Sequence, residues 1–173
     1  MGRPKALLQL GGKTFLDNIL EAIAGSAISQ VIVVVGHHRK EIEDSAPNAS
    51  IIYNPDYELG MVTSFQTGIR SLPPGSSGAM LFLVDHPVVE PAVIRTLLDH
   101  AAGNRIAVPV FQGRRGHPVL FGKETLAEVL ELTASEGPNS VVRKDPARVI
   151  EVPVDHPGIL VDVDTPADYQ KLL

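Results

Sequence analysis

Hydrophobic positions along the chain form two patterns that alternate with each other. Uninterrupted apolar runs at residues 31–35 and 79–84 are typical of strands buried on both faces, as in a parallel sheet. Shorter apolar runs predict further strands at 51–53, 106–110, 118–121, 149–152 and 159–161. Strands of this kind need helices on both faces of the sheet to cover them.

The segments between these runs carry apolar residues at helical spacing. They predict helices at 14–25, 62–72, 91–98, 123–132 and 166–173. Thr14 is a favourable N-cap, and Pro91 and Pro166 suit the first turn of a helix.

The alternation of strands and helices predicts βαβ units. Residues 106–110 and 117–121 are joined by a short segment containing two glycines, which predicts a hairpin instead. The expected fold is therefore α/β, with three layers (αβα) and a mixed, mostly parallel sheet. At 173 residues the chain fits a single domain, 1–173.

Composition narrows the class of protein. Hydrophobic residues make up 44 % of the chain and charged residues 20 %, which is ordinary for a globular protein. The net charge of −5 disfavours a nucleic-acid partner, since duplex binders usually carry a basic face. The absence of cysteine excludes disulfides, zinc thiolate sites and cysteine nucleophiles. With no long apolar run and no visible secretory signal, we expect no membrane association and a cytoplasmic location.

Acidic residues follow two of the predicted strands. Asp85 comes directly after 79–84, and Asp162 and Asp164 come after 159–161. Ligands of open α/β sheets bind beyond the carboxyl ends of the strands, and carboxylates gathered there suit Mg²⁺ together with substrate phosphates. The alternative is that Asp162 and Asp164 only cap the last helix and Asp85 only forms a turn.

Two further segments carry candidate binding residues. The positively charged side chain of Lys5 could point toward a polyphosphate, or it could be a solvated surface charge. The segment 54–65 leads from a strand into a helix, where Gly60 permits close backbone approach and Ser64 lies in the first turn. An ordinary connecting loop explains this segment equally well. The spacing of the histidines does not favour a histidine-based metal site.

Five motifs in order resemble the nucleotidyltransferases that activate molybdopterin, the molybdenum cofactor cytidylyltransferase and guanylyltransferase group. Residues 1–8 resemble the end of its N-terminal Arg-Met-Gly-x-x-Lys signature, and 60–65 resemble its Gly-Met-Ser-x-Ser-Leu segment. Residues 85–87 resemble its Asp-x-Pro metal motif, 113–120 its Gly-His-Pro segment, and 162–168 its Asp-x-Asp-Thr-Pro-x-Asp ending. The segments around Gly60 and Gly116 are closer to the cytidylyl branch.

The resemblance implies a Rossmann-like (GT-A-like) nucleotidyltransferase that joins CMP from CTP to molybdopterin and releases pyrophosphate. It implies that Asp85 and Asp164 or Asp162 bind Mg²⁺ and that Lys5 contacts the triphosphate. Gly60 and Ser64 would line the base or sugar site. Catalysis would depend on Lys5 and Asp85, and a molybdoenzyme or chaperone is a possible partner.

The resemblance also implies that His117 faces the acceptor substrate. The family's Gly-His-Pro segment, which 113–120 resembles, lies on the acceptor side.

One departure from the family pattern leaves alternatives open. Family members carry a strand and a glycine-rich loop before the Met-Gly pair that corresponds to Met1 and Gly2 here. The fold is therefore expected to lack the family's first strand, and the apolar edges of neighbouring strands should be exposed. The alternatives to the cytidylyl enzyme are a guanylyl or sugar-phosphate nucleotidyltransferase and a non-catalytic remnant without the triphosphate loop.

Overall fold

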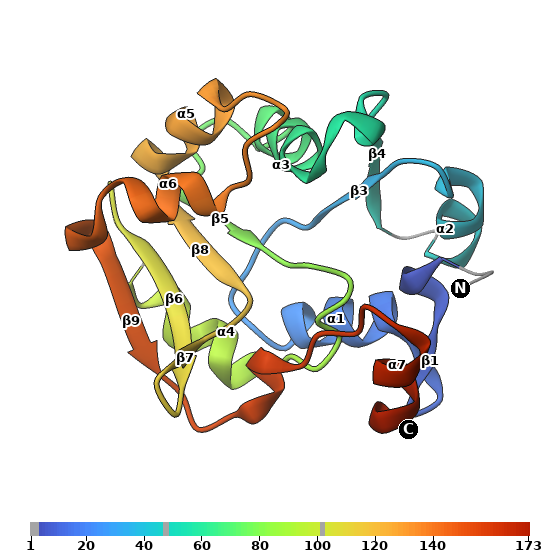
Figure 1. Ribbon diagram of the computed structural model, residues 1–173. Helices are drawn as coiled ribbons and strands as arrows, with labels where there is room; N and C mark the ends of the chain where they lie inside the picture. Colours follow the sequence, from blue (N-terminus) through green and yellow to red (C-terminus); the bar gives the residue numbers. More distant parts are fainter. Residues whose placement is uncertain (1–3, 47–48, 101–102) are drawn as a thin grey trace.

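The computed structural model describes residues 4–46, 49–100 and 103–173 (Figure 1). The first three residues of the N-terminal motif lie outside the described residues. The larger sheet has the strand order β5-β8-β6-β7, and β9 pairs with β6. These strands are β5 (Gly78–Leu81), β6 (Ile106–Phe111), β7 (Arg114–Arg115), β8 (Val119–Gly122) and β9 (Val149–Pro153).

Two shorter strand pairs lie outside this sheet. β3 (Ile32–Val35) pairs in parallel with β4 (Ser50–Tyr53). β1 (Gln9–Leu10) and β2 (Lys13–Thr14) form a hairpin. In the described part of the chain β3 and β5 are not paired with each other, so the sheet is interrupted between them. The sequence led us to expect exposed apolar edges here, but the residues of β3 and β5 are mostly half-buried.

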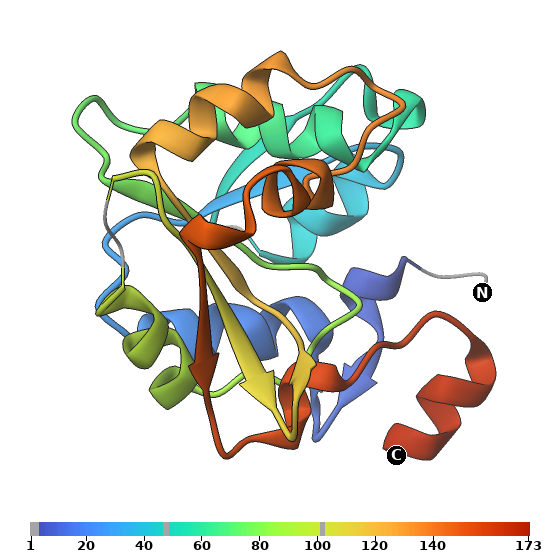
Figure 2. The same ribbon diagram turned by 60° about the vertical axis from the view of Figure 1, so that its left-hand side comes forward.

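Helices cover both faces of the sheet, as the alternating pattern predicts (Figure 2). Side chains on α3, α5 and α6 pack against the inward-facing Ile106 and Val108 of β6. Ala107, between them, points to the opposite face and packs against α4. α1 packs beside α4 on that face. The helices are α1 (Phe15–Ala24), α2 (Arg39–Ser45), α3 (Met61–Arg70), α4 (Pro91–Leu98), α5 (Lys123–Glu131), α6 (Asn139–Lys144) and α7 (Pro166–Leu172).

The caps account for where α1 and α7 begin. Thr14 accepts a hydrogen bond from the backbone of Asp17, whose carboxylate accepts one in return, which is a complete capping box. Thr165 and Asp168 form the same arrangement at α7. Pro91 occupies the first turn of α4, as predicted.

The strand predicted at 159–161 is wrong. Ile159 and Leu160 belong to a 3₁₀ helix, Pro157–Leu160, and Val161 follows it outside any strand. Ile159 is nearly fully buried, and a short buried apolar run does not distinguish a strand from a turn. Pro157 begins the turn, and the N–H of Val161 donates to the carbonyl of Gly158. Three further 3₁₀ turns are Lys5–Leu7, Tyr57–Leu59 and Pro146–Arg148.

Two expectations about the sheet need adjustment. The run 79–84 forms a strand only to Leu81, after which the chain leaves the sheet toward Asp85. The sheet is mixed, as expected, but parallel pairing in the described part occurs only at β3–β4 and β6–β9. Antiparallel pairs are more frequent than predicted because β8 inserts between β5 and β6.

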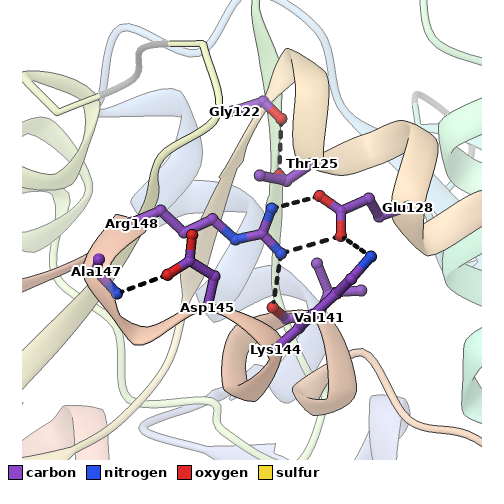
Figure 3. A network of polar contacts seen from close by, with 8 residues as sticks. All are labelled: Gly122, Thr125, Glu128, Val141, Lys144, Asp145, Ala147 and Arg148. Atoms are coloured by element: carbon purple, nitrogen blue, oxygen red, sulfur yellow. Dashed lines mark hydrogen bonds and ion pairs between the residues drawn. The ribbon is translucent and has the colours of Figure 1, made fainter.

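A partly buried ion-pair network joins α5 to α6 and to the 3₁₀ turn before β9 (Figure 3). The Arg148 guanidinium, whose side chain is 9 % exposed, donates to both oxygens of Glu128 and to the carbonyl of Val141. Lys144 donates to the same carboxylate. Hydrogen bonds from Arg148 and then Lys144 lower the pKa of Glu128 from 4.5 to about 2.

No helix within 4–46, 49–100 and 103–173 has the length and hydropathy to cross a bilayer.

This network predicts a pH-dependent loss of stability in Glu128→Gln. We expect a free energy of unfolding lower by about 1 kcal/mol near pH 7, because the carboxylate is partly solvent-exposed and its pair is screened. A lowered folded-state pKa contributes stability above pH 4.5 that is lost as the pH falls toward about 2. Urea unfolding of both proteins between pH 7 and pH 2 measures this.

The difference between the two proteins should therefore shrink over that range. A difference that is constant with pH would contradict the ion-pair account. Glu131→Gln, an exposed position on the same helix, serves as the control.

Candidate functional site

Three chain segments meet at the carboxyl edge of the sheet. Lys5 begins the first 3₁₀ turn, Asp85 follows the extended segment after β5, and Asp164 precedes α7. The Lys5 Nζ donates to Asp164 Oδ1 at 2.7 Å and lies 3.6 Å from Asp85 Oδ2. The two carboxylates therefore lie together as the sequence predicts, and the structure adds Lys5 to them, although the three residues come from both ends and the middle of the chain.

The backbone holds the two acidic segments side by side. The N–H of Val163 donates to the carbonyl of Asp85 at 2.9 Å, and Val163 is nearly fully buried. Because side chains alternate along an extended segment, burying Val163 turns Asp162 and Asp164 away from it. Both of these aspartates are exposed.

The electrostatics of the cluster favour a charged Lys5. Partial burial alone would lower its pKa, but the hydrogen bond to Asp164 and the fields of Asp85 and Asp162 raise it. Burial also raises the pKa of Asp162, and the neighbouring Asp164 and Asp85 add to this, while His86 acts in the opposite direction. A site with this excess of negative charge is suited to binding a cation.

A possible metal-binding group lies at the same place. Asp85, His86 and Asp162 each offer one ligand atom, and these atoms all lie within 4.8 Å of one another. The Oδ1 atom of Asp85 is buried and has no hydrogen-bond partner in the described part of the chain. Two carboxylates and an imidazole suit a divalent cation, so the residues present fit one. Asp164 instead contacts Lys5.

The sequence does not mark His86 as a metal ligand, because no second histidine lies at metal-ligand spacing from it. The only available signal was its position next to Asp85 at a strand end. The rings of His86 and His117 lie 4.6 Å apart between centroids. Burial, and then the neighbouring His86, lower the pKa of His117 to about 4, although Asp85 opposes this. The His117 ring is therefore neutral at pH 7.

His117 reaches this position through a close backbone approach. Its N–H donates to the carbonyl of Ile159, and a Cβ on Gly116 would come within 2.3 Å of that oxygen. Glycine is therefore the residue that this contact permits. The peptide bond between His117 and Pro118 is cis.

Gly60 and Ser64 lie at the start of α3. Gly60 has φ 139°, and a Cβ there would come within 2.6 Å of the carbonyl oxygen of Ala134. The buried Asn54 donates to the hydroxyls of Thr63 and Ser64, which fixes the first turn of the helix. Sequence reasoning did not single out Asn54, because only its burial marks it.

The structure connects Ser64 to the acidic cluster through a shared cavity. Ser64 and Asp85 both line the groove that separates β3 from β5. The contact that requires glycine at Gly60 is instead with the loop after α5. A role of Gly60 in nucleotide binding therefore stays a prediction.

Comparisons with known proteins bear on what this site does. The model of the MobA-like NTP transferase domain matches residues 1–159. Among curated proteins, the molybdenum cofactor cytidylyltransferase of Escherichia coli K12 is 27 % identical over 172 residues, which are 98 % of this chain and 86 % of that protein. The bifunctional protein GlmU of Neisseria gonorrhoeae is 24 % identical over 155 residues, covering 87 % of this chain and 33 % of GlmU.

Solved structures give the same fold. A Mycobacterium tuberculosis H37Rv protein, solved as a complex with manganese, superposes with a TM-score of 0.86 and 26 % identity, covering 99 % of this chain and 92 % of that one. A nucleotidyl transferase from Methanothermobacter thermautotroptrophicus superposes with a TM-score of 0.84 and 24 % identity, covering 97 % of this chain and 82 % of that one, so the α/β fold with its mixed sheet is that of a nucleotidyltransferase.

The backbone at Gly60 predicts a strong penalty in Gly60→Ala. The left-handed φ and the short approach to Ala134 together should lower the free energy of unfolding by about 1–3 kcal/mol. Thermal and urea unfolding measure the loss. Gly137→Ala is the matched control, because a Cβ there meets nothing within 4 Å. Equal stability of the two variants would contradict the steric account.

Proposed function

Because the chain belongs to the MobA-like NTP transferase family, we propose that it transfers a cytidylyl group from CTP to molybdopterin with Mg²⁺ and releases pyrophosphate. The observation that carries this proposal is the cluster of Lys5, Asp85 and Asp164 at the carboxyl edge of the sheet. The choice of CTP and molybdopterin is supported by the similarity to the cytidylyltransferase of E. coli.

In the proposed reaction, a phosphate oxygen of the acceptor forms a bond to the α-phosphorus of CTP. The bond between that phosphorus and the oxygen bridging to the β-phosphate breaks, and pyrophosphate leaves with the electron pair. Little covalent chemistry is asked of the protein, so catalysis consists of orienting the two phosphates in line and neutralising charge.

Lys5 is the residue proposed to contact the triphosphate. Its raised pKa keeps it charged, and its neighbours Asp85 and Asp164 hold it at the strand ends. The ammonium group can exchange Asp164, which is exposed, for a phosphate oxygen without being removed from the site. A positive charge near the departing pyrophosphate stabilises the transition state.

Asp85 and Asp162 are the residues proposed to hold the divalent cation, with His86 as a further ligand. Asp164 is the alternative carboxylate that the family motif suggests as a ligand. When bound, the cation would supply charge neutralisation on the phosphate oxygens. Carboxylates favour Mg²⁺, whereas the imidazole makes Mn²⁺ an acceptable substitute. The manganese complex of the mycobacterial neighbour supports testing both ions.

His117 is proposed to face the acceptor, and Gly60 and Ser64 to line the base or sugar site. The neutral ring of His117 can donate one hydrogen bond to a phosphate and accept another without adding charge. A molybdoenzyme or chaperone would receive the product, in the cytoplasm. The roles of His117, Gly60 and Ser64 rest on the family motifs, and that of His117 also on its position against His86.

A second candidate function is nucleotidyl transfer to a sugar phosphate. The match to GlmU over 87 % of this chain favours considering it. Lys5, Asp85 and Asp162 would have the same roles in both reactions, because both reactions use a nucleoside triphosphate and a divalent cation. Only the base and the acceptor would differ.

Nucleotide binding provides the first test. Titration calorimetry with CTP, GTP and UTP in the presence of Mg²⁺, and then Mn²⁺, should show CTP binding at least about tenfold more tightly than the others. Preference for GTP or UTP would replace the cytidylyl assignment with one of the alternatives. Absence of heat with all three nucleotides would favour a non-catalytic protein.

Asp85→Asn tests the proposed metal site. We expect kcat to fall by about 100-fold or more, because the variant removes the ligand charge while the backbone carbonyl that binds Val163 remains. Pyrophosphate release from CTP with the molybdopterin acceptor measures the rate, and circular dichroism checks the fold. Asp99→Asn, an exposed position after α4, is the control. Near-normal turnover would remove Asp85 from the site.

A further inference from the structure

Asp162 and Asp164 stand two residues apart, yet they have different partners. A carboxylate oxygen of Asp162 lies within 4.8 Å of the ligand atoms that Asp85 and His86 offer. The Oδ1 atom of Asp164 instead accepts a hydrogen bond from Lys5 Nζ at 2.7 Å. Among the residues that the structure describes, Asp164 does not belong to the group of possible cation ligands. The structure therefore distinguishes two carboxylates between which the sequence motif does not choose.

The buried residue between the two carboxylates fixes this division. Val163 is 1 % exposed, and its N–H donates to the carbonyl of Asp85 at 2.9 Å, so the segment cannot slide along its neighbour. Side chains two residues apart in an extended segment point to the same side, about 7 Å from each other. At this spacing Asp162 reaches the side chain of Asp85, and Asp164 reaches Lys5.

The contact between Lys5 and Asp164 is the one that a ligand can replace most easily. The side chains of Lys5 and Asp85 are 29 % and 28 % exposed, whereas that of Asp164 is 64 % exposed. A carboxylate that is already largely hydrated loses little when it turns fully into water. Asp85 lies farther from the ammonium group, at 3.6 Å, and belongs to the group of possible cation ligands.

Asp164 occupies the place at Lys5 that a phosphate would take. Carboxylate and phosphate oxygens are both anionic acceptors for an ammonium donor, so they compete for the same group. An anion that binds at Lys5 must first break the pair with Asp164, and its measured affinity is reduced by the fraction of molecules in which the pair is closed. The same reduction applies to a triphosphate that enters and to a pyrophosphate that leaves.

From this geometry we propose that Asp164 is an internal competitor for Lys5 and is not a ligand of the cation. The triphosphate displaces it on binding. After the reaction it takes Lys5 back, which shortens the time that pyrophosphate remains bound. Asp164 thus acts through Lys5 and does not touch the reacting atoms. The proposal rests on the proposed function, because it requires that Lys5 binds the triphosphate.

The binding of inorganic pyrophosphate tests the competition. In calorimetric titrations without divalent cations and then with Mg²⁺, Asp164→Asn should bind pyrophosphate about threefold to fivefold more tightly than the unchanged protein, which is the scale of an exposed ion pair. Damage to the fold would not increase affinity, and the capping box of α7 uses Thr165 and Asp168 instead. Asp164→Glu keeps the charge and should return the affinity toward the original value.

Asp162→Asn is the matched control. It removes the same charge near Lys5 but not the contact with its ammonium group, so pyrophosphate affinity without divalent cations should change by less than about twofold. Binding of Mn²⁺ in the absence of anions, followed by electron paramagnetic resonance, should respond in the opposite way. We expect Asp162→Asn to weaken it by about tenfold or more and Asp164→Asn to leave it within about twofold.

Each other outcome overturns the proposal in a recognisable way. Weaker Mn²⁺ binding in Asp164→Asn would make Asp164 a cation ligand. Equal tightening of pyrophosphate binding in both asparagine variants would show a general effect of charge and no competition at Lys5. Unchanged pyrophosphate affinity in Asp164→Asn would also overturn the competition, while Lys5 would keep its proposed contact with the triphosphate. If neither the unchanged protein nor Asp164→Asn binds pyrophosphate, the proposed function fails together with this inference.

Discussion

The backbone hydrogen bond from Val163 to Asp85 joins the two segments on which the candidate site depends. One segment leaves the sheet after β5, and the other leads into α7. Burial of Val163 between them turns the flanking Asp162 and Asp164 outward. Carboxylates from distant parts of the chain are thereby held close together, which their mutual repulsion would otherwise oppose.

Lys5 offsets that repulsion. It contacts both Asp85 and Asp164, so the first described turn of the chain is anchored to the last strand-to-helix connection. The hydroxyl of Tyr169 on α7 adds a hydrogen bond to the carbonyl of Gln9. The same contacts that assemble the site therefore also hold the two ends of the described chain beside each other (Figure 1).

The interruption of the sheet and the candidate site are neighbouring features. Asp85 and Ser64 lie at the wall of the groove whose remaining lining is mostly apolar. The groove explains why strands that the sequence predicts as fully buried are only half-buried. On the other side, where β8 lies between β5 and β6, all four residues of β8 are buried.

The sequence alone determined the local elements, because capping residues, prolines and apolar spacing act within a few positions. Thr14 with Asp17 and Thr165 with Asp168 fix helix starts, and the carboxylates Asp85, Asp162 and Asp164 were identifiable from their places after apolar runs. Tertiary structure decided the rest. The turn at Ile159, the ring of His86 beside Asp162, and the split between β3 and β5 all depend on contacts between distant residues, which local patterns do not encode.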